Sequence, residues 1–251
     1  MNTRTDPIIE VKNLTAGYTN FTLFDNISFQ VNPGEIFAIL GTSGCGKSTL
    51  MKLMTGLFKP KKGSILIQGQ ELADADLDQR IAILRGIGVA FQSGALFGSM
   101  SVIENVKLPL EEFSDLPQGA MDAIATTKLA LVGLGEYLNF MPDALSGGMK
   151  KRAALARAMA LDPAIVFLDE PSAGLDPVTS AELDKLIKAL RTSLGITFVI
   201  VTHELDSIFS IADRVIMLDK STRGIIATGG PLELKQDQTK PLVYNFFNRI
   251  A

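Results

Sequence analysis

The chain of 251 residues is 47% hydrophobic, which is enough to bury one sizeable core together with an inserted subdomain. Its net charge of −3 at pH 7 lacks the excess of positive charge that is typical of nucleic-acid-binding proteins, so we expect no nucleic-acid partner. Cys45 is the only cysteine, which excludes an intrachain disulfide and a cysteine-based metal cluster.

The stretch 1–7 lacks the apolar core of a secretory signal peptide, so we expect the protein to stay in the compartment where it is made.

The first predicted elements are strands. Apolar and polar residues alternate over 8–14 and 24–31, and a turn at 32–35 leads into the apolar run 36–40. These patterns predict two half-buried strands followed by a buried one. The apolar runs of the chain have strand length, so no segment is expected to cross a membrane.

A glycine-rich loop follows the buried strand. The stretch 41–49 fits G-x-x-x-x-G-K-[ST] and precedes a helical pattern, the arrangement of a phosphate-binding loop. Glycines let the backbone turn tightly around phosphates, and the helix N-terminus adds partial positive charge. Lys47 supplies a full charge to the β- and γ-phosphates, and the Ser48 hydroxyl can hold Mg²⁺. We therefore expect a nucleotide to be bound by Gly41, Ser43, Gly44, Cys45, Gly46, Lys47, Ser48 and Thr49.

The middle of the chain changes from strands to helices. Strands are predicted over 64–69 and 87–91. Apolar residues then recur at helical spacing, with glycines and prolines between the segments, over 102–112, 118–132 and 147–161. This run predicts a helical subdomain inserted between two core strands. We interpret its basic cluster, 150–152, as a solvated helix face.

The core resumes with an unbroken apolar strand, 164–168, that ends in Asp169 and Glu170. Two adjacent carboxylates at the end of a buried strand are unfavourable unless a cation meets them. Asp169 fits a position beside Mg²⁺, and Glu170 can hold a water in line with the γ-phosphate and act as general base. The structural alternative is a helix N-cap with an acidic first turn, which does not explain why an apolar strand leads straight into both charges.

Polar residues follow two other core strands. His203, the only histidine, comes after the strand 196–202, and Gln92 comes after the strand 87–91. A lone histidine is usually structural or superficial, but strands alternating with helices predict a mostly parallel sheet covered on both faces. Ligands bind at the carboxyl edge of such sheets. We therefore expect His203 near the γ-phosphate and Gln92 on the metal or the attacking water.

A second candidate anion site lies at Ser146, Gly147 and Gly148, immediately before a helix. A GTPase or a small-molecule kinase, which the phosphate loop alone leaves open, has no need of such a patch. One ATP cannot easily occupy both this site and Lys47 within a single chain. Two chains arranged head to tail could sandwich two ATPs.

The order of these motifs resembles that of the ABC ATPases. The matching segments are 41–49 (Walker A), Gln92 (Q-loop), 145–149 (signature), 165–170 (Walker B), 172–176 (D-loop) and His203 (switch). From its position alone, Tyr18 is either a half-buried strand aromatic or a ring that stacks on a purine, and the resemblance implies stacking on adenine. The resemblance also implies a RecA-like phosphate-loop core with an N-terminal antiparallel β part (1–92 and 158–235), an inserted helical subdomain (93–157) and a tail (236–251).

A finer resemblance comes from 91–97, Met149 and 151–158, which are similar to the branch that powers MCE-type lipid transporters such as the Mla system. It implies a homodimeric ATPase, peripheral on the cytoplasmic face of the inner membrane, that drives a permease. An MCE-domain lipid-binding protein and a small STAS-domain protein would be further partners. The implied function is movement of phospholipid or a similar lipid between membranes of the cell envelope. Transport of another solute and soluble regulation without a permease are the alternatives, with a soluble kinase more remote.

Two surfaces are open to two interpretations each. Leu96, Phe97 and Met100 would lie where a cytoplasmic helix of the permease docks, or they pack inside the helical subdomain. The tail is amphipathic, with apolar residues at helical spacing at Leu242, Val243, Phe246, Phe247 and Ile250. It either docks on its own core or forms a partner surface.

Overall fold

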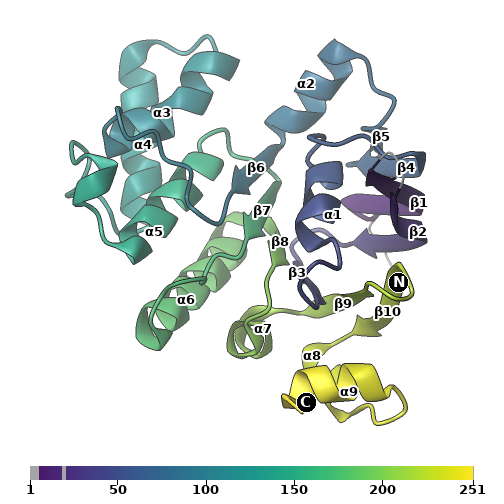
Figure 1. Cartoon of the computed structure of the whole chain (residues 1–251). Helices are drawn as coiled ribbons and strands as arrows, with labels where there is room; N and C mark the ends of the chain where they lie inside the picture. Colours follow the sequence, from purple (N-terminus) through teal and green to yellow (C-terminus); the bar gives the residue numbers. More distant parts are fainter. Residues whose placement is uncertain (1–5, 19–20, 251) are drawn as a thin grey trace, which may run out of the picture.

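A computed structural model describes residues 6–18 and 21–250; the prediction made from 1–7 falls mostly outside them. The first sheet is antiparallel and contains β1 (Ile9–Tyr18), β2 (Phe21–Val31), β4 (Lys62–Ile67) and β5 (Gln70–Glu71), in the order β2-β1-β4-β5 (Figure 1). This confirms the N-terminal antiparallel part. Strand β1 is longer than the predicted 8–14, because register shifts interrupt its alternation between Val11 and Gly17.

The second sheet is the one that positions the candidate site. Its strands are β3 (Ile36–Gly41), β6 (Ile87–Ala90), β7 (Ile165–Asp169), β8 (Thr197–Val201), β9 (Arg214–Asp219) and β10 (Gly224–Gly229). Their order is β10-β9-β3-β8-β7-β6, and every pairing except β9 with β10 is parallel. The predicted mostly parallel sheet is confirmed, and the carboxyl ends of β3, β8, β7 and β6 meet at one edge.

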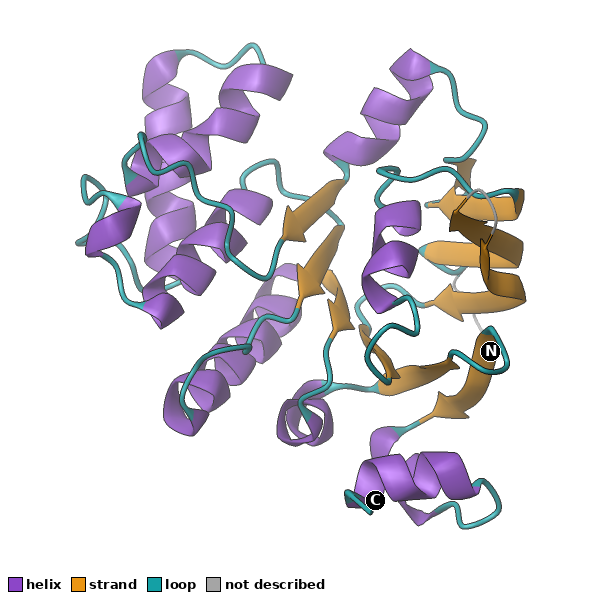
Figure 2. Ribbon diagram, in the orientation of Figure 1, coloured by secondary structure: helices purple, strands orange, loops and turns teal. Residues whose placement is uncertain are grey.

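Helices cover both faces of this sheet (Figure 2). Helix α1 (Lys47–Met54) lies between the two sheets, and α6 (Pro177–Leu194) and α7 (Leu205–Ile211) cover the opposite face. The inserted helices gather on one side of the molecule: α3 (Val102–Phe113), α4 (Gln118–Leu131) and α5 (Gly147–Ala158), with the short η1 (Pro142–Ala144) before α5. Within the described residues, no helix is both long enough and apolar enough to span a membrane.

Several helix boundaries differ from the predictions. Helix α5 ends at Ala158 instead of Leu161, because the N–H of Met159 is shared between the carbonyls of Leu155 and Ala156 and that of Ala160 bonds three residues back, which tightens the chain into a turn. Helix α2 (Leu77–Arg85) was not predicted, since Ile83 is its only buried residue and its apolar periodicity is weak. The start of this helix could nevertheless have been predicted, because Asp76 and Gln79 have the spacing of a capping box.

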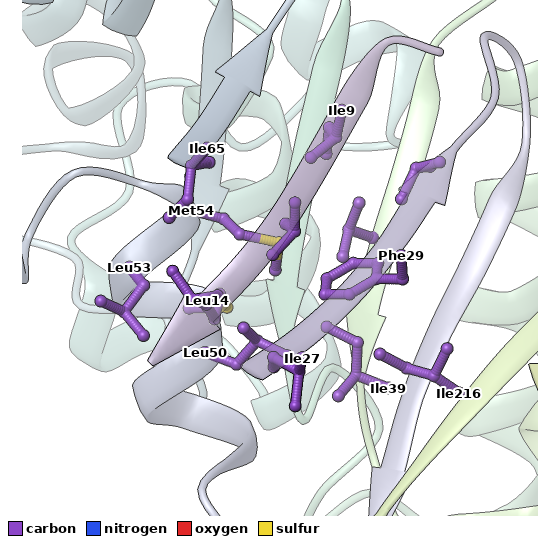
Figure 3. Packing of buried hydrophobic residues seen from close by; sticks show 14 of the residues in the cluster. Ile9, Leu14, Ile27, Phe29, Ile39, Leu50, Leu53, Met54, Ile65 and Ile216 are labelled. Carbon is purple, nitrogen blue, oxygen red and sulfur yellow. The ribbon is translucent and has the colours of Figure 1, made fainter. Parts of the chain in front are cut away.

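One hydrophobic cluster fills the space between the sheets. Figure 3 shows side chains that converge there from the antiparallel strands, from α1 and from one face of the parallel sheet: Ile9, Leu14, Ile27, Phe29, Ile65, Leu50, Leu53, Met54, Ile39 and Ile216. All of them are buried. Each Å² of apolar area removed from water stabilises the fold by about 25 cal/mol. Burial in this cluster therefore holds β3 and α1, and hence the loop between them, in fixed positions.

The opposite face of the sheet is covered in two parts. Alternate residues of β7 and β8, such as Val166 and Phe198, pack against the inserted helices and α6. The tail folds onto the strands β3 and β9 through α8 (Pro231–Gln236) and α9 (Pro241–Asn248), where Val243 and Phe247 are buried. The tail therefore docks on its own core, although Leu242 remains 63% exposed.

Candidate active site

The glycine-rich loop joins the end of β3 to α1, and two of its glycines are required by close packing. Gly41 has φ 146°, and a Cβ there would lie 2.5 Å from Cys45 Sγ and from the Leu218 carbonyl oxygen. Gly46 has φ 104°, and a Cβ there would lie 2.5 Å from the ring of Phe24. Larger residues would displace the loop from the core on which it rests.

The start of α1 is arranged to receive an anion. Among residues 6–18 and 21–250, no side chain caps the N-terminus of this helix, and its first turn contains no acidic residue, so its N–H groups and dipole remain directed at the loop. Lys47 belongs to this first turn, and its Nζ donates to the Gly41 carbonyl oxygen at 2.9 Å. Ser43, Gly44 and Ser48 are exposed. Cys45 is buried beneath the loop.

An open cleft of about 970 Å³ surrounds the loop. Its lining includes Tyr18, Gly41, Ser43, Gly44, Gly46, Lys47, Ser48, Thr49, Gln92, Glu170 and His203. Most of the residues predicted to bind nucleotide thus come together, while Cys45 and Asp169 are not among the lining residues. Tyr18 is 58% exposed, and its ring lies 5.6 Å from that of Phe58. This exposure favours a stacking surface over a half-buried strand position.

The ends of β7 and β8 place an acid beside the histidine. These strands are parallel neighbours, with Asp169 opposite Val201. Glu170 has φ 47°, a conformation that non-glycine residues seldom adopt. Its N–H donates to the Val201 carbonyl oxygen at 2.7 Å. His203 Nδ1 lies 2.8 Å from Glu170 Oε1, with Glu170 12% and His203 59% exposed.

One further oxygen of each acidic residue at the end of β7 is buried and unpaired in the part of the chain that the structure describes. Within the described residues, Asp169 Oδ1 and Glu170 Oε2 are buried without a hydrogen-bond partner. Burial and the neighbouring charge of Glu170 raise the pKa of Asp169, and the Ser48 hydroxyl acts in the opposite direction. A carboxylate left in this state, next to a hydroxyl, fits a hard cation that takes oxygen ligands. The N-cap alternative is wrong, because Asp176 caps the following helix through the N–H groups of Val178 and Thr179.

The basic run in α5 is not a solvated face. Lys151 Nζ donates to the carbonyl oxygen of Gln92 and, at 3.0 Å, to that of Glu170. Arg152 bonds to Glu182 at 2.9 Å and to the Val132 carbonyl oxygen. The prediction failed because α5 packs against β6. Helical spacing could have indicated this contact, because Lys151 lies on the same face of α5 as the buried residues Gly148 and Leu155.

The predicted second anion patch begins α5. Ser146 is the N-cap and accepts from the N–H of Met149 at 3.3 Å. Ser146 and Gly147 are exposed, whereas a Cβ on the buried Gly148 would lie 2.6 Å from Thr179 Cγ2. None of the three lines the cleft around Lys47. The chain therefore presents two separate candidate phosphate sites.

Comparisons with known proteins agree with this arrangement. The family model described as ABC transporter matches residues 24–173. The chain is 41% identical over 231 residues to the intermembrane phospholipid transport system ATP-binding protein of Haemophilus influenzae, covering 92% of this chain and 87% of that protein. It is 39% identical to a probable ribonucleotide transport ATP-binding protein of Mycobacterium leprae, covering 96% of this chain and 68% of the relative.

Two solved structures are similar over most of the chain. The cbiO1 protein of Clostridium perfringens, part of the ABC transporter complex cbiONQ, matches with a TM-score of 0.85 and 30% identity, over 96% of this chain and 95% of that one. The ATP-binding cassette MJ0796, solved as a dimer in a post-hydrolysis state with ADP and Pi, matches with a TM-score of 0.80 and 30% identity, over 88% and 98%.

Proposed function

Because the chain belongs to the ABC transporter family of ATP-binding proteins, whose cassettes bind and hydrolyse ATP, we propose that it powers the transport of phospholipid or a similar lipid between membranes of the cell envelope. The observation that carries the ATPase role is the convergence of Lys47, Glu170 and His203 on one cleft. The lipid is supported by the similarity to the Haemophilus phospholipid transport protein. The Mycobacterium leprae relative, named for ribonucleotides, supports the second candidate, transport of another solute.

In this proposal the cleft binds ATP from both ends. The exposed ring of Tyr18 stacks on adenine, while the loop N–H groups and Lys47 hold the phosphates. Ser48, Asp169 and Gln92 are the oxygen-bearing residues that would hold Mg²⁺, and the ion would neutralise charge on the phosphate oxygens. The buried, partnerless Asp169 Oδ1 supports this assignment.

Glu170 has two different oxygens for its two tasks. Oε1 is held by His203 at 2.8 Å, which fixes the orientation of the carboxylate. Oε2 is buried and, among the described residues, has no hydrogen-bond partner. We propose that this carboxylate takes the proton of the attacking water as the water oxygen bonds to the γ-phosphorus. The bond from phosphorus to the bridging oxygen of ADP then breaks, and ADP and phosphate leave.

The site is completed by a second copy of the chain. Ser146, Gly147 and Gly148 do not line their own cleft, yet they form an exposed helix N-terminus suited to an anion. We propose that they close over the ATP held by Lys47 of the partner copy, as supported by the dimeric state of the similar MJ0796 cassette. On closure the helical subdomain, 93–157, would move relative to the core, 1–92 and 158–235.

An apolar groove of about 550 Å³ lies between α2, β6 and α3. Its lining includes Leu84, Phe97, Leu108 and Phe113, and Phe97 is 51% exposed. We propose that a cytoplasmic helix of a membrane permease docks here, because the segment after Gln92 leads directly from the cleft to this groove. Leu96 instead packs into the chain's own core, so core packing accounts for that residue.

The proposed assembly is peripheral, on the cytoplasmic face of the inner membrane. An MCE-domain protein would carry lipid beyond that membrane, and a small STAS-domain protein would bind the ATPase. The segments similar to MCE-type ATPases, around Gln92 and Met149, support both partners. A soluble regulator without a permease would leave the exposed apolar groove without a role.

Purification of the assembly tests the transport role. The tagged chain is isolated from membranes in mild detergent, and its partners and bound lipids are identified by mass spectrometry. A permease, an MCE-domain protein and co-purified phospholipid are expected. Phe97→Glu should abolish recovery of the permease, whereas Leu232→Glu, at a 65% exposed residue on the distant α8, should not. A permease with a different soluble ligand would support the second candidate, and the absence of any membrane partner would refute transport.

A further inference from the structure

One side chain of the inserted helices reaches two strand ends of the core. Lys151 Nζ donates to the carbonyl oxygen of Gln92, after β6, and to that of Glu170, after β7, the latter at 3.0 Å. Both acceptors are main-chain atoms, so the ammonium acts on the course of the backbone. Burial lowers the pKa of Lys151, and the charges of Glu170 and Asp169 act in the opposite direction.

The backbone that Lys151 contacts is in a strained conformation. Glu170 has φ 47°, a conformation that is unfavourable for a non-glycine residue and persists only where the surroundings hold it. Its N–H is held by Val201, and its carbonyl oxygen accepts from Lys151 and from the N–H of Ala173 at 3.2 Å. The contacts from Val201 and Ala173 are made by main-chain groups of the core. The third is made by the side chain of Lys151, which lies in the helical subdomain, 93–157.

We propose that Lys151 is a positioning residue for ATP hydrolysis. By holding the carbonyl groups of Gln92 and Glu170 at a fixed separation, it keeps the Glu170 side chain in position at the lining of the cleft. Lys151 also belongs to α5, the helix that begins at Ser146. The same helix therefore joins the patch proposed to serve the partner's ATP to the base that serves its own. This inference rests on the proposed role of Glu170 as general base.

The test compares Lys151→Met with Lys151→Arg and with the control Lys150→Met, which removes a neighbouring lysine of the same helix that has no described role at the strand ends. ATP turnover of the full chain is measured against ATP concentration, and nucleotide affinity is measured separately with a fluorescent ATP analogue. Loss of hydrogen bonds from a charged donor predicts a fall in kcat of about tenfold or more for Lys151→Met, with nucleotide affinity unchanged. Lys151→Arg should restore most of kcat, and Lys150→Met should match the unmodified chain.

A second readout does not depend on turnover. Hydrogen exchange of the peptide spanning 168–173 should be faster in Lys151→Met than in the unmodified chain, because the strained turn loses its side-chain support. Should Lys151→Met unfold, Lys151→Gln replaces it in both measurements. If kcat and exchange are both unchanged, or if kcat and nucleotide affinity fall together, Lys151 has no positioning role. If the unmodified chain itself hydrolyses no ATP, the proposed function fails, and the exchange rates still decide the inference.

Discussion

Replacing Glu170 by Gln is the sharpest test of the proposed chemistry. The side chain is 12% exposed, and its Oε2 is the buried oxygen without a partner. The amide keeps the shape and can still bond to His203 through the contact of 2.8 Å at Oε1, but it cannot take a proton. Loss of a general base slows a reaction by about 10²–10⁴-fold, which corresponds to about 3–5 kcal/mol of activation free energy.

The same substitution should strengthen retention of ATP. Removing a negative charge beside the γ-phosphate lowers repulsion, and without hydrolysis the closed state persists. We expect Glu170→Gln to form a stable ATP-bound dimer in size-exclusion chromatography with light scattering, while phosphate release falls by the factor given above. The matched control is Glu204→Gln, because Glu204 also lies near His203, at 3.6 Å, but is 46% exposed. Unchanged phosphate release, or a monomer at saturating ATP and Mg²⁺, would refute the reasoning.

Two further predictions concern α5 and the core. Ser146→Phe should leave ATP binding by the monomer intact but abolish dimerisation and turnover, whereas Ser101→Phe, which removes the equivalent N-cap of α3, should affect only stability; equal turnover in the two variants would contradict the sandwich. Burial raises the pKa of Asp184 above its ordinary 3.8 in the folded chain, with the Ser207 hydroxyl opposing this. The folded chain then binds the proton more tightly than the unfolded chain, so its stability falls as pH rises through the interval above 3.8. The free energy of unfolding, measured in urea as a function of pH, should no longer show this decline in Asp184→Asn. If the variant and the unmodified chain lose the same stability over this pH interval, the prediction is wrong.

The phosphate loop and the acidic strand end could be read from the sequence because their chemistry is local. A run of apolar residues that ends in Gly41 or in Asp169 defines both a buried strand and the point where its chain leaves the sheet. Once strands alternate with helices, parallel topology follows, and polar residues after the strands are expected at one edge. His203 and Gln92 were predicted on that argument, and both line the cleft.

The residues that were misread depend on contacts distant in sequence. Lys151 looks like any basic residue of an exposed helix until α5 is packed against β6. Its hydrogen-bond partners lie 59 residues away at Gln92 and 19 residues away at Glu170. The amphipathic tail presents the same ambiguity, because an apolar stripe on a helix does not indicate whether the chain's own core or a partner covers it. Docking of Val243 and Phe247 beside α7 resolved it.

The chain's own residues were therefore sufficient to define which groups carry charge and which strand each group follows, because spacing along a strand or helix is set by backbone geometry. The order of strands in the sheet, the contact of His203 with Glu170 and the reach of Lys151 to both strand ends were decided only by the tertiary fold. Strand pairing and helix docking join residues far apart in the chain, and burial of a shared core, rather than local sequence, selects among the possible partners.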